Sequence, residues 1–551
     1  MTNKKDLLFY ILVAAALLRL VNLSAGDTVN DEVFMAFRGI EMIDFDEAAQ
    51  QTTPWEWQDP DIKWWARLSF HDHPLLVPYI QHIFMAMFGE NNFAFRLPSA
   101  ILGTASVYLL YLIGTLLYSQ NAGLLSAAFL GTTLNSVYIS RTGMQEPYVI
   151  FLMLLGAYLF LKSLQNEKYL PWVGVILGLA AEAKYTSFIL VPIFIIYLLL
   201  YKREYFQNKN FWYGVLLAIT IFSPSIIYNA MLYLEVGHFD FQFSHILGQR
   251  PEVWEITPGK EIGSLTDRIK NFIPRMMHSN SWLLLSLTDL SIIALIISIF
   301  KNWREALNKN SFLLITFPFL LLLLLLIGPS YRFLTILTPF LALAIGTVLT
   351  KIWGLHYFGN KLALLMIAPI FLFEIFYSVN NQILAYPVGP EPWLASKVRY
   401  ENYNWGYNEL GEFLEKELSG KMPALSFDLQ YKFLEGLRDQ ALEKGQSDGL
   451  EPYPALFVYS GNFDLGAKLW VLDRLHIYHA WPIISLKTYY DYLQENGFDY
   501  YDRVGFKNYY FILQTNAVPS EADQALMRGL PISIYNKRGE EVFKIYKYNY
   551  R

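Results

Sequence analysis

The chain has 551 residues, of which 54% are hydrophobic and 17% are charged, and its mean hydropathy is +0.27. A soluble protein has no place for an apolar run such as residues 320–327, so the composition indicates a membrane protein. The net charge of −5 gives no sign of a nucleic-acid partner. The absence of cysteine excludes disulfides, thiolate catalysis and cysteine-bound metals.

About eleven apolar stretches are long enough to cross a bilayer, which takes about 17–25 residues. They are residues 6–22, 97–118, 121–139, 147–164, 170–183, 186–201, 211–230, 281–300, 311–327, 332–350 and 361–378. The first stretch follows Lys4 and Lys5 and has no convincing small-residue cleavage site after it. We therefore interpret it as an uncleaved span rather than a signal peptide.

The distribution of basic residues predicts the orientation, because short cytoplasmic loops are rich in lysine and arginine. With the N-terminus inside, the inside loops contain Lys4/Lys5, Lys162/Lys168, Lys202/Arg203/Lys209, Lys301/Arg304/Lys309 and Lys351/Lys361. The short outside turns contain few basic residues, among them Arg141, Lys184 and Arg332. We expect a multi-pass plasma-membrane protein with a cytoplasmic N-terminus.

In this topology residues 23–96 and 231–280 form long outside loops. The first loop contains Asp31, Glu32 and a tryptophan-rich piece, and its apolar stretch 74–88 is interrupted by Pro78 and polar residues. We interpret this stretch as a helix in the membrane interface rather than as a span. The second loop contains an amphipathic stretch near residues 263–277.

The composition changes after about residue 380, where charged and aromatic residues and turn signals become frequent. Helical patterns at 407–418 and 486–494 alternate with short apolar runs at 424–427, 455–459, 469–472, 509–513, 532–535 and 542–546. Residues 536–539 are typical of a hairpin turn. The fold class is therefore a polytopic α-helical membrane domain, residues 1–380, followed by an extracytoplasmic α/β domain, residues 381–551.

Several charged residues fall at the outside ends of the expected spans. Asp31-Glu32 comes about nine residues after the first span, Glu146 lies in a turn before Pro147, and Lys184 and Arg332 lie in other outside turns. Each has an ordinary explanation: a solvated loop acid, an acid favoured by a helix dipole, or a snorkelling cation. Together they favour a reaction on a phosphorylated lipid, in which cations stabilise a leaving phosphate and a carboxylate accepts a proton.

The sequence assigns no metal site. His71, Asp72 and His73 do not complete a ligand set, because spacing of two along a chain is not diagnostic. A divalent cation bound through the oxygens of Asp31, Glu32 and Glu146 stays possible.

The order of the motifs resembles a known family. The motifs are Asp31-Glu32, His73-Pro74-Leu75, Phe93–Ala100 with Arg96 and Pro98, Glu146-Pro147, Ala183–Thr186, and Tyr331-Arg332-Phe333 with Pro339. Over about residues 1–350 the chain resembles the membrane-embedded glycosyltransferases that use polyprenyl-phosphate sugars, the GT-C superfamily of protein O-mannosyltransferases and lipid A aminoarabinose transferases.

The resemblance implies roles for individual residues. Asp31, with Glu32 beside it, corresponds to the acid that acts as base or orients the acceptor, and Glu146 corresponds to a second acid that is usually aspartate in the aminoarabinose transferases. Lys184, Arg332, Tyr331 and His73 correspond to the region that binds the donor phosphate, although histidine stands where a basic residue is expected. The tail is not explained by the family core, and it either recognises an acceptor or caps the outer face.

The resemblance therefore predicts an inverting transfer from a polyprenyl-phosphate sugar to a lipid, polysaccharide or protein acceptor at the outer face. A polytopic transporter or lipid flippase is the main alternative, but internal repeats are not visible and the polar residues cluster at one face rather than at mid-depth. A receptor without enzymatic activity would leave Asp31, Glu146, Lys184 and Arg332 without a purpose.

Overall fold

The computed structural model describes residues 4–44, 63–249, 263–301, 303–353, 360–427 and 434–549. The chain divides into two compact units. Within the described ranges, the first unit comprises residues 4–23, 38–44 and 63–400, and the second comprises residues 24–37 and 401–549. The tryptophan-rich piece at Trp55 and Trp57 lies outside the described residues.

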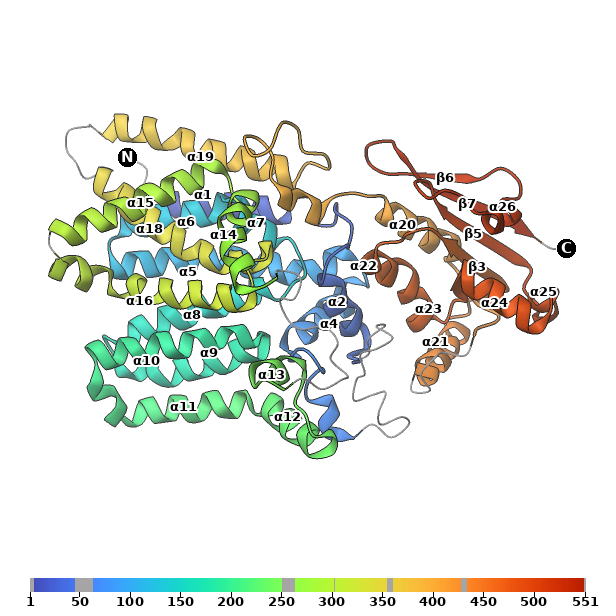
Figure 1. Cartoon of the computed structure of the whole chain (residues 1–551), viewed down its shortest axis with the longest axis horizontal. Helices are drawn as coiled ribbons and strands as arrows, with labels where there is room; N and C mark the ends of the chain where they lie inside the picture. Colours follow the sequence, from blue (N-terminus) through green and yellow to red (C-terminus); the bar gives the residue numbers. More distant parts are fainter. Residues whose placement is uncertain are drawn as a thin grey trace. The chain divides into compact units, whose positions relative to one another are not determined.

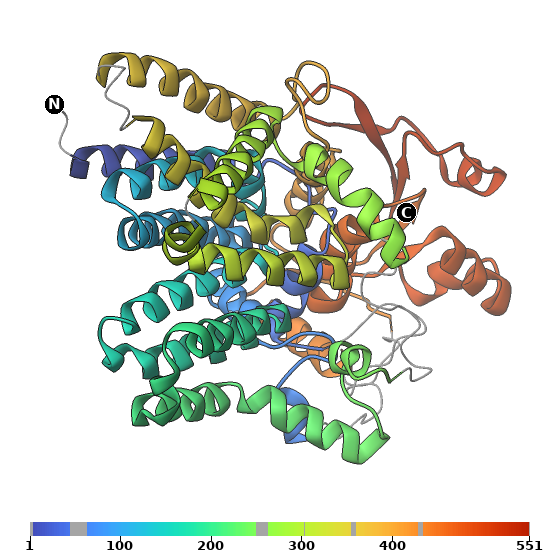
Figure 2. The ribbon, with the colours of Figure 1, turned by 60° about the vertical axis from the view of Figure 1, so that its left-hand side comes forward.

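The first unit is a bundle of long helices that run side by side (Figure 1), and the turned view shows the same packing (Figure 2). The bundle helices are α1 (Lys4–Leu20), α5 (Asn92–Leu117), α6 (Gln120–Thr132), α7 (Leu134–Ser140), α8 (Glu146–Ser163), α9 (Leu170–Ala183), α10 (Leu190–Tyr201), α11 (Lys209–Ile221), α12 (Ser223–Val236), α15 (Trp282–Lys301), α16 (Trp303–Ile327), α18 (Thr338–Trp353) and α19 (Asn360–Gln382). One large apolar core, which includes Phe129, Tyr148 and Leu320, joins most of them.

Helices occur at every apolar stretch that the sequence indicated, but the count of eleven spans is not confirmed. Five helices among the described residues are long and apolar enough to cross a membrane, or up to seven if each bent pair forms one span. The bent pairs are α6 with α7, at 61°, and α11 with α12, at 55°. The second bend coincides with Pro224 at the start of α12, where proline cannot donate a helical hydrogen bond.

Buried arginines hold the ends of the first helices in place. Arg141 donates to the carbonyl oxygens of Val21 and Asn22, both at 2.7 Å, and to two carbonyls at the end of α1. Arg19 donates to the carbonyl of Gly131 at 2.9 Å and to Ser136 Oγ at 2.8 Å. These side chains satisfy carbonyl groups that have no partner at a helix end, so they stabilise the bundle rather than forming an open cationic site.

Shorter helices gather at the end of the bundle where α8 begins. They include α4 (Leu76–Phe88), α13 (Phe241–Ile246), α14 (Leu265–Ser279) and α17 (Tyr331–Leu334). At 13 residues, or about 20 Å, α4 is shorter than a hydrocarbon core of about 30 Å, which agrees with an interfacial helix. The amphipathic α14 starts with a capping box at Ser264 and Asp267, and it runs crosswise to the long helices (Figure 1).

The second unit contains a five-stranded sheet in the order β4-β3-β5-β7-β6, with bounds β3 (Ala455–Ser460), β4 (Ile483–Ser485), β5 (Asn508–Gln514), β6 (Ile532–Tyr535) and β7 (Glu541–Asn549). β3 is parallel to β4 and β5, whereas β7 is antiparallel to β5 and β6. Strands β1 (Lys421–Pro423) and β2 (Glu451–Tyr453) form a separate parallel pair. The helices are α20 (Tyr407–Leu418), α21 (Glu435–Ser447), α22 (Leu465–Lys468), α23 (Arg474–His479), α24 (Leu486–Asn496), α25 (Tyr500–Val504) and α26 (Glu521–Leu526).

The segment that carries Asp31 and Glu32 is held within this second unit. Asp27 accepts four backbone hydrogen bonds, at 2.6–3.1 Å, from residues 405–408 at the start of α20. Asn30 donates to the carbonyl of Glu401 at 3.0 Å. An aspartate that caps a helix from a distant part of the chain ties the two segments together, so α2 (Glu32–Glu41) begins at a fixed position in the unit.

Candidate active site

Two residues 38 positions apart form a buried ion pair at one end of the bundle. Lys184 Nζ donates to Glu146 Oε1 at 2.6 Å. Glu146 is the first residue of α8 and is 1% exposed, and Lys184 directly follows α9 and is 9% exposed. In such a site the two charges depend on each other, because removal of either leaves an uncompensated buried charge.

The backbone around this pair is fixed by a second contact. Gln145 Nε2 donates to the carbonyl of Ala183 at 3.1 Å, so the residues that precede the two charged groups are joined as well. Lys184 itself is extended, and its carbonyl accepts from Ser187 N at 3.0 Å in the turn that leads to α10. The backbone of Lys184 is therefore fixed, and its ammonium group is held by Glu146.

Arg332 brings a second cation to the same place. The Arg332 guanidinium and Lys184 Nζ each lie 4.9 Å from the centroid of the Phe333 ring. Arg332 is also close enough to interact electrostatically with Glu146. Lys184 and Arg332, predicted from separate parts of the sequence, thus meet at one aromatic ring with Glu146 beside them, and the three charges sum to +1.

Helix α14 adds residues that sequence reasoning missed. The Arg275 guanidinium lies 5.8 Å from the centroid of the Tyr331 ring, and Tyr331 Oη lies 3.5 Å from His278 Nδ1. Partial burial and the nearby cations Lys397 and Arg275 lower the pKa of His278. The amphipathic pattern of this stretch was visible in the sequence, but its packing beside Tyr331 and Arg332 is a tertiary contact.

His73 lies in a different polar network. His73 Nδ1 is 3.0 Å from Asp72 Oδ2, and Arg38 donates to Asp72 Oδ1 at 2.6 Å. His71 Nδ1 is 2.8 Å from Asp44 Oδ1. Burial opposes ionisation of Asp72, but Arg38 and the neighbouring histidines outweigh it and hold the pKa of this carboxyl well below its ordinary value. The contact of His73 with a donor phosphate stays a prediction.

The acid pair differs in exposure. Asp31 is exposed, whereas Glu32 is completely buried and starts α2, where its backbone N–H bonds Asn30 Oδ1 at 3.0 Å. Both belong to the second unit, and Glu146, Lys184 and Arg332 belong to the first. Of the two acids, Asp31 is the one whose side chain is accessible from solvent. The roles assigned to both stay predictions.

The structure indicates no metal site among the residues it describes, since no three or more histidine, aspartate or glutamate side chains there are arranged to hold an ion. The cluster around Phe333 offers two cations, one carboxylate and the polar groups of α14. Such a cluster suits a phosphate group, which carries negative charge and accepts several hydrogen bonds.

The fold is shared with two proteins whose structures have been solved. ArnT from Cupriavidus metallidurans, solved with undecaprenyl phosphate, matches with a TM-score of 0.53 at 13% identity, over 98% of this chain and 97% of that one. The oligosaccharyltransferase of Archaeoglobus fulgidus, solved with zinc and sulfate, matches with a TM-score of 0.51 at 13% identity, over 98% of this chain and 72% of that one.

Sequence comparison gives a family for part of the chain. Residues 72–228 match the family described as dolichyl-phosphate-mannose-protein mannosyltransferase. The putative mannosyltransferase YycA of Bacillus subtilis (strain 168) is 30% identical over 142 residues, and YkcB of the same organism is 23% identical over 236 residues. These matches cover 25% and 40% of this chain, but only 21% and 30% of the two relatives. The resemblance drawn from the motifs is confirmed for this segment and for the fold.

Proposed function

We propose that the protein is an integral-membrane glycosyltransferase that moves a sugar from a polyprenyl-phosphate donor to an acceptor at the extracytoplasmic face. The single observation that carries this proposal is the convergence of Lys184 and Arg332 on Phe333 beside the buried Glu146. The mannosyltransferase match at residues 72–228 and the fold shared with ArnT support it. The ArnT structure contains bound undecaprenyl phosphate, which is a polyprenyl phosphate.

In the proposed reaction an acceptor oxygen attacks the anomeric carbon while the bond from that carbon to the phosphate oxygen breaks. The single displacement inverts the anomeric centre, and polyprenyl phosphate departs. Lys184 and Arg332 stabilise the charge that develops on the phosphate, and Glu146 orients the Lys184 ammonium. Asp31 orients the acceptor or accepts its proton, with the buried Glu32 supporting the start of α2.

We also propose an orientation in the membrane. The N-terminus is cytoplasmic, and the α/β unit lies outside the membrane. The acceptor is a lipid, a polysaccharide or a protein. Within the second unit, Asp27 and Asn30 fix the segment that carries Asp31.

The test supplies membranes that contain the full chain with radiolabelled polyprenyl-phosphate mannose, the donor that the family match suggests first. We expect label to move covalently to an acceptor, and this transfer to be lost in Asp31→Asn. Glu521→Gln is the control, because Glu521 is also an exposed acid of the second unit and lies at the start of α26, as Asp31 lies directly before α2. Accumulation of a solute without covalent transfer would instead support a transporter, and unchanged transfer in Asp31→Asn would remove Asp31 from the site.

A further inference from the structure

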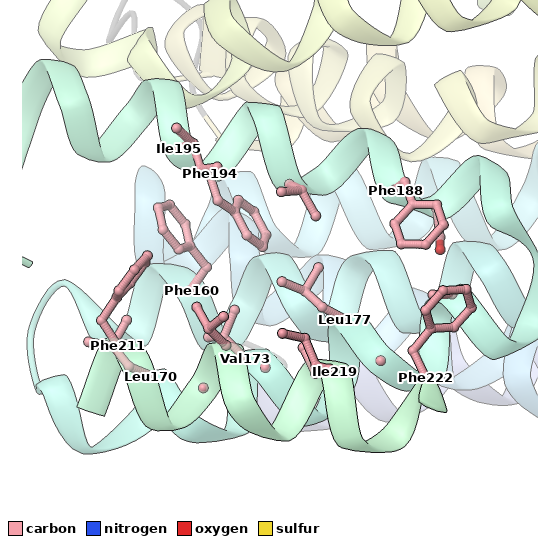
Figure 3. Close-up of a pocket in the computed structure, with 18 of the residues that line it drawn as sticks. Phe160, Leu170, Val173, Leu177, Phe188, Phe194, Ile195, Phe211, Ile219 and Phe222 are labelled. Atoms are coloured by element: carbon pink, nitrogen blue, oxygen red, sulfur yellow. The ribbon is translucent and has the colours of Figure 1, made fainter. Parts of the chain in front are cut away.

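The first unit contains a second feature that the proposed reaction does not use. A cavity of about 240 Å³ lies among α8, α9, α10 and α11, and its lining is hydrocarbon apart from Ser187 (Figure 3). An apolar cavity of roughly 150 Å³ already excludes water and takes up small apolar ligands. The lining residues Phe188, Ile195 and Ile219 are 37%, 38% and 54% exposed, so the cavity opens on the outer surface of the bundle.

Close packing of two helices creates the space. A Cβ atom on Gly174 of α9 would lie 1.8 Å from the carbonyl oxygen of Gly214 of α11. The two backbones are therefore in direct contact, and α10 stands apart from them across the cavity. From Phe211 to Phe222 the lining follows α11 for about 16 Å, the length of an extended hydrocarbon chain rather than of a compact ligand.

Aromatic rings line one end of the cavity, and basic residues flank the other. At the aromatic end the Phe222 ring packs against Phe188 at 5.1 Å and against Tyr185 at 5.8 Å between centroids. At the other end the lining residues Leu170, Leu198 and Phe211 lie within four positions of Lys168, Lys202 and Lys209. Arg203 is also present there, with Glu167 and Glu204 as the acids, so the basic residues outnumber the acidic ones.

Exposed aromatic residues mark the same end as a membrane interface. Tyr169, Trp172, Tyr201, Trp212 and Tyr213 are all between 36% and 60% exposed there. Tyrosine and tryptophan gather at the level of lipid head groups, and basic residues next to spans attract anionic lipids. This end lies opposite Glu146, since α8 runs from Glu146 to Ser163 and α9 starts after it.

We infer that this cavity is a binding site for one anionic phospholipid, whose acyl chain fills the space between α9, α10 and α11 and whose phosphate lies among Lys168, Lys202 and Lys209. The donor lipid fits this place poorly. Lys184 is directed toward Glu146 and Phe333, and the contacts of Tyr185, Phe188 and Phe222 separate it from the cavity. The inference does not rest on the proposed enzymatic activity.

The test measures lipid binding to the purified full chain by native mass spectrometry and by thermal unfolding, with phosphatidylglycerol and phosphatidylcholine of identical chains as probes. We expect one tightly held lipid and a ten- to hundred-fold preference for phosphatidylglycerol, because each basic residue near the surface contributes about 1 kcal/mol to binding an anionic lipid. The triple variant Lys168→Gln/Lys202→Gln/Lys209→Gln should reduce this preference to about one. The matched triple variant Lys301→Gln/Lys309→Gln/Lys351→Gln should keep it.

A second variant tests the cavity itself. Val191→Phe places a larger side chain in the lining, and we expect it to lose the bound lipid, whereas Ile296→Phe on the exposed face of α15 should retain it. Equal affinity for the two lipids would overturn the inference, as would the same preference in both triple variants. Retention of lipid in Val191→Phe, or a bound mass that corresponds to polyprenyl phosphate, would also overturn it.

Discussion

The pairing of Glu146 with Lys184 gives the most informative prediction. Glu146 is 1% exposed, so Lys184→Met leaves a buried carboxylate without its hydrogen-bonded cation, with Arg332 as the remaining nearby positive charge. Removal of one partner of a buried pair costs about 3–5 kcal/mol, whereas replacement of both by uncharged groups of similar size is close to neutral. We therefore expect Lys184→Met and Glu146→Gln each to destabilise the protein by about this amount. The double variant should recover most of the loss.

Activity should behave differently from stability. If Lys184 stabilises the departing phosphate, its loss lowers kcat/KM by about 10²–10³, as for removal of one preorganised electrostatic donor. The double variant should therefore fold well and remain inactive. Stability is measured by thermal unfolding in detergent, and activity is measured by transfer from the labelled donor.

The exposed pair Asp499 and Arg503 is the control, because its side chains are 68% and 58% exposed and its contribution should lie near 0–1 kcal/mol. Additive losses of stability in the two single variants at Glu146 and Lys184 would refute the argument about the buried pair. Full activity in the folded double variant would refute the role of Lys184 in binding phosphate.

Three further predictions concern the supporting structure. Arg38 holds the pKa of Asp72 low, so the stability that this carboxylate contributes is present above about pH 4 and is lost as the pH falls further. The difference in Tm between the wild type and Asp72→Asn should therefore shrink from pH 6 to pH 3. A constant difference would contradict this expectation. Gly174→Ala should destabilise the protein by about 1–3 kcal/mol or more, because the added Cβ meets the backbone of α11. Gly156→Ala should be tolerated, because the contacts of its Cβ lie at 3.5 Å or beyond. Equal unfolding curves for the two variants would count against this packing. Asp27→Ala should destabilise the second unit by about 1–2 kcal/mol and lower transfer by releasing the segment of Asp31, and unchanged proteolysis and transfer would remove that positioning role.

The helices of the first unit were predictable because long apolar stretches have few alternatives in a membrane. The number of spans was not, since α9 and α10 have only 14 and 12 residues and two other apolar stretches are bent pairs. Hydropathy reports the length of an apolar run, but it does not report a bend at Thr133 or Phe222. The bend at Phe222 coincides with Pro224, whereas the sequence has no proline at the bend at Thr133.

In the second unit, the turn at residues 536–539 and the runs at 455–459, 509–513, 532–535 and 542–546 were read correctly, and strands β3, β5, β6 and β7 occupy those places. The run at 469–472 does not form a strand, because it is part of a continuous helical segment from α22 to α23. Its residues Leu469 to Leu472 are all buried, and a short buried apolar run has the same pattern in a helix as in a strand. The run at 424–427 also lies outside a strand, since β1 ends at Pro423.

The candidate site was partly predictable. Turns at the same end of successive spans must meet at one face, which is why Glu146, Lys184 and Arg332 could be grouped in advance. The contribution of Arg275 and His278 depends on the placement of α14, and the anchoring of Asp31 depends on hydrogen bonds between Asp27 and residues about 380 positions away. No local pattern encodes such contacts, so one sequence alone could not reveal them.

The most direct test of the central claim follows the donor lipid itself. The purified full chain in liposomes is incubated with polyprenyl-phosphate mannose and a membrane extract as the source of acceptor, and mass spectrometry quantifies free polyprenyl phosphate and mannosylated product. The account predicts equal amounts of both, formed with inversion and strongly reduced in Arg332→Ala. Donor that stays intact with every acceptor fraction and with other polyprenyl-linked sugars, while the wild-type chain remains folded, would contradict it.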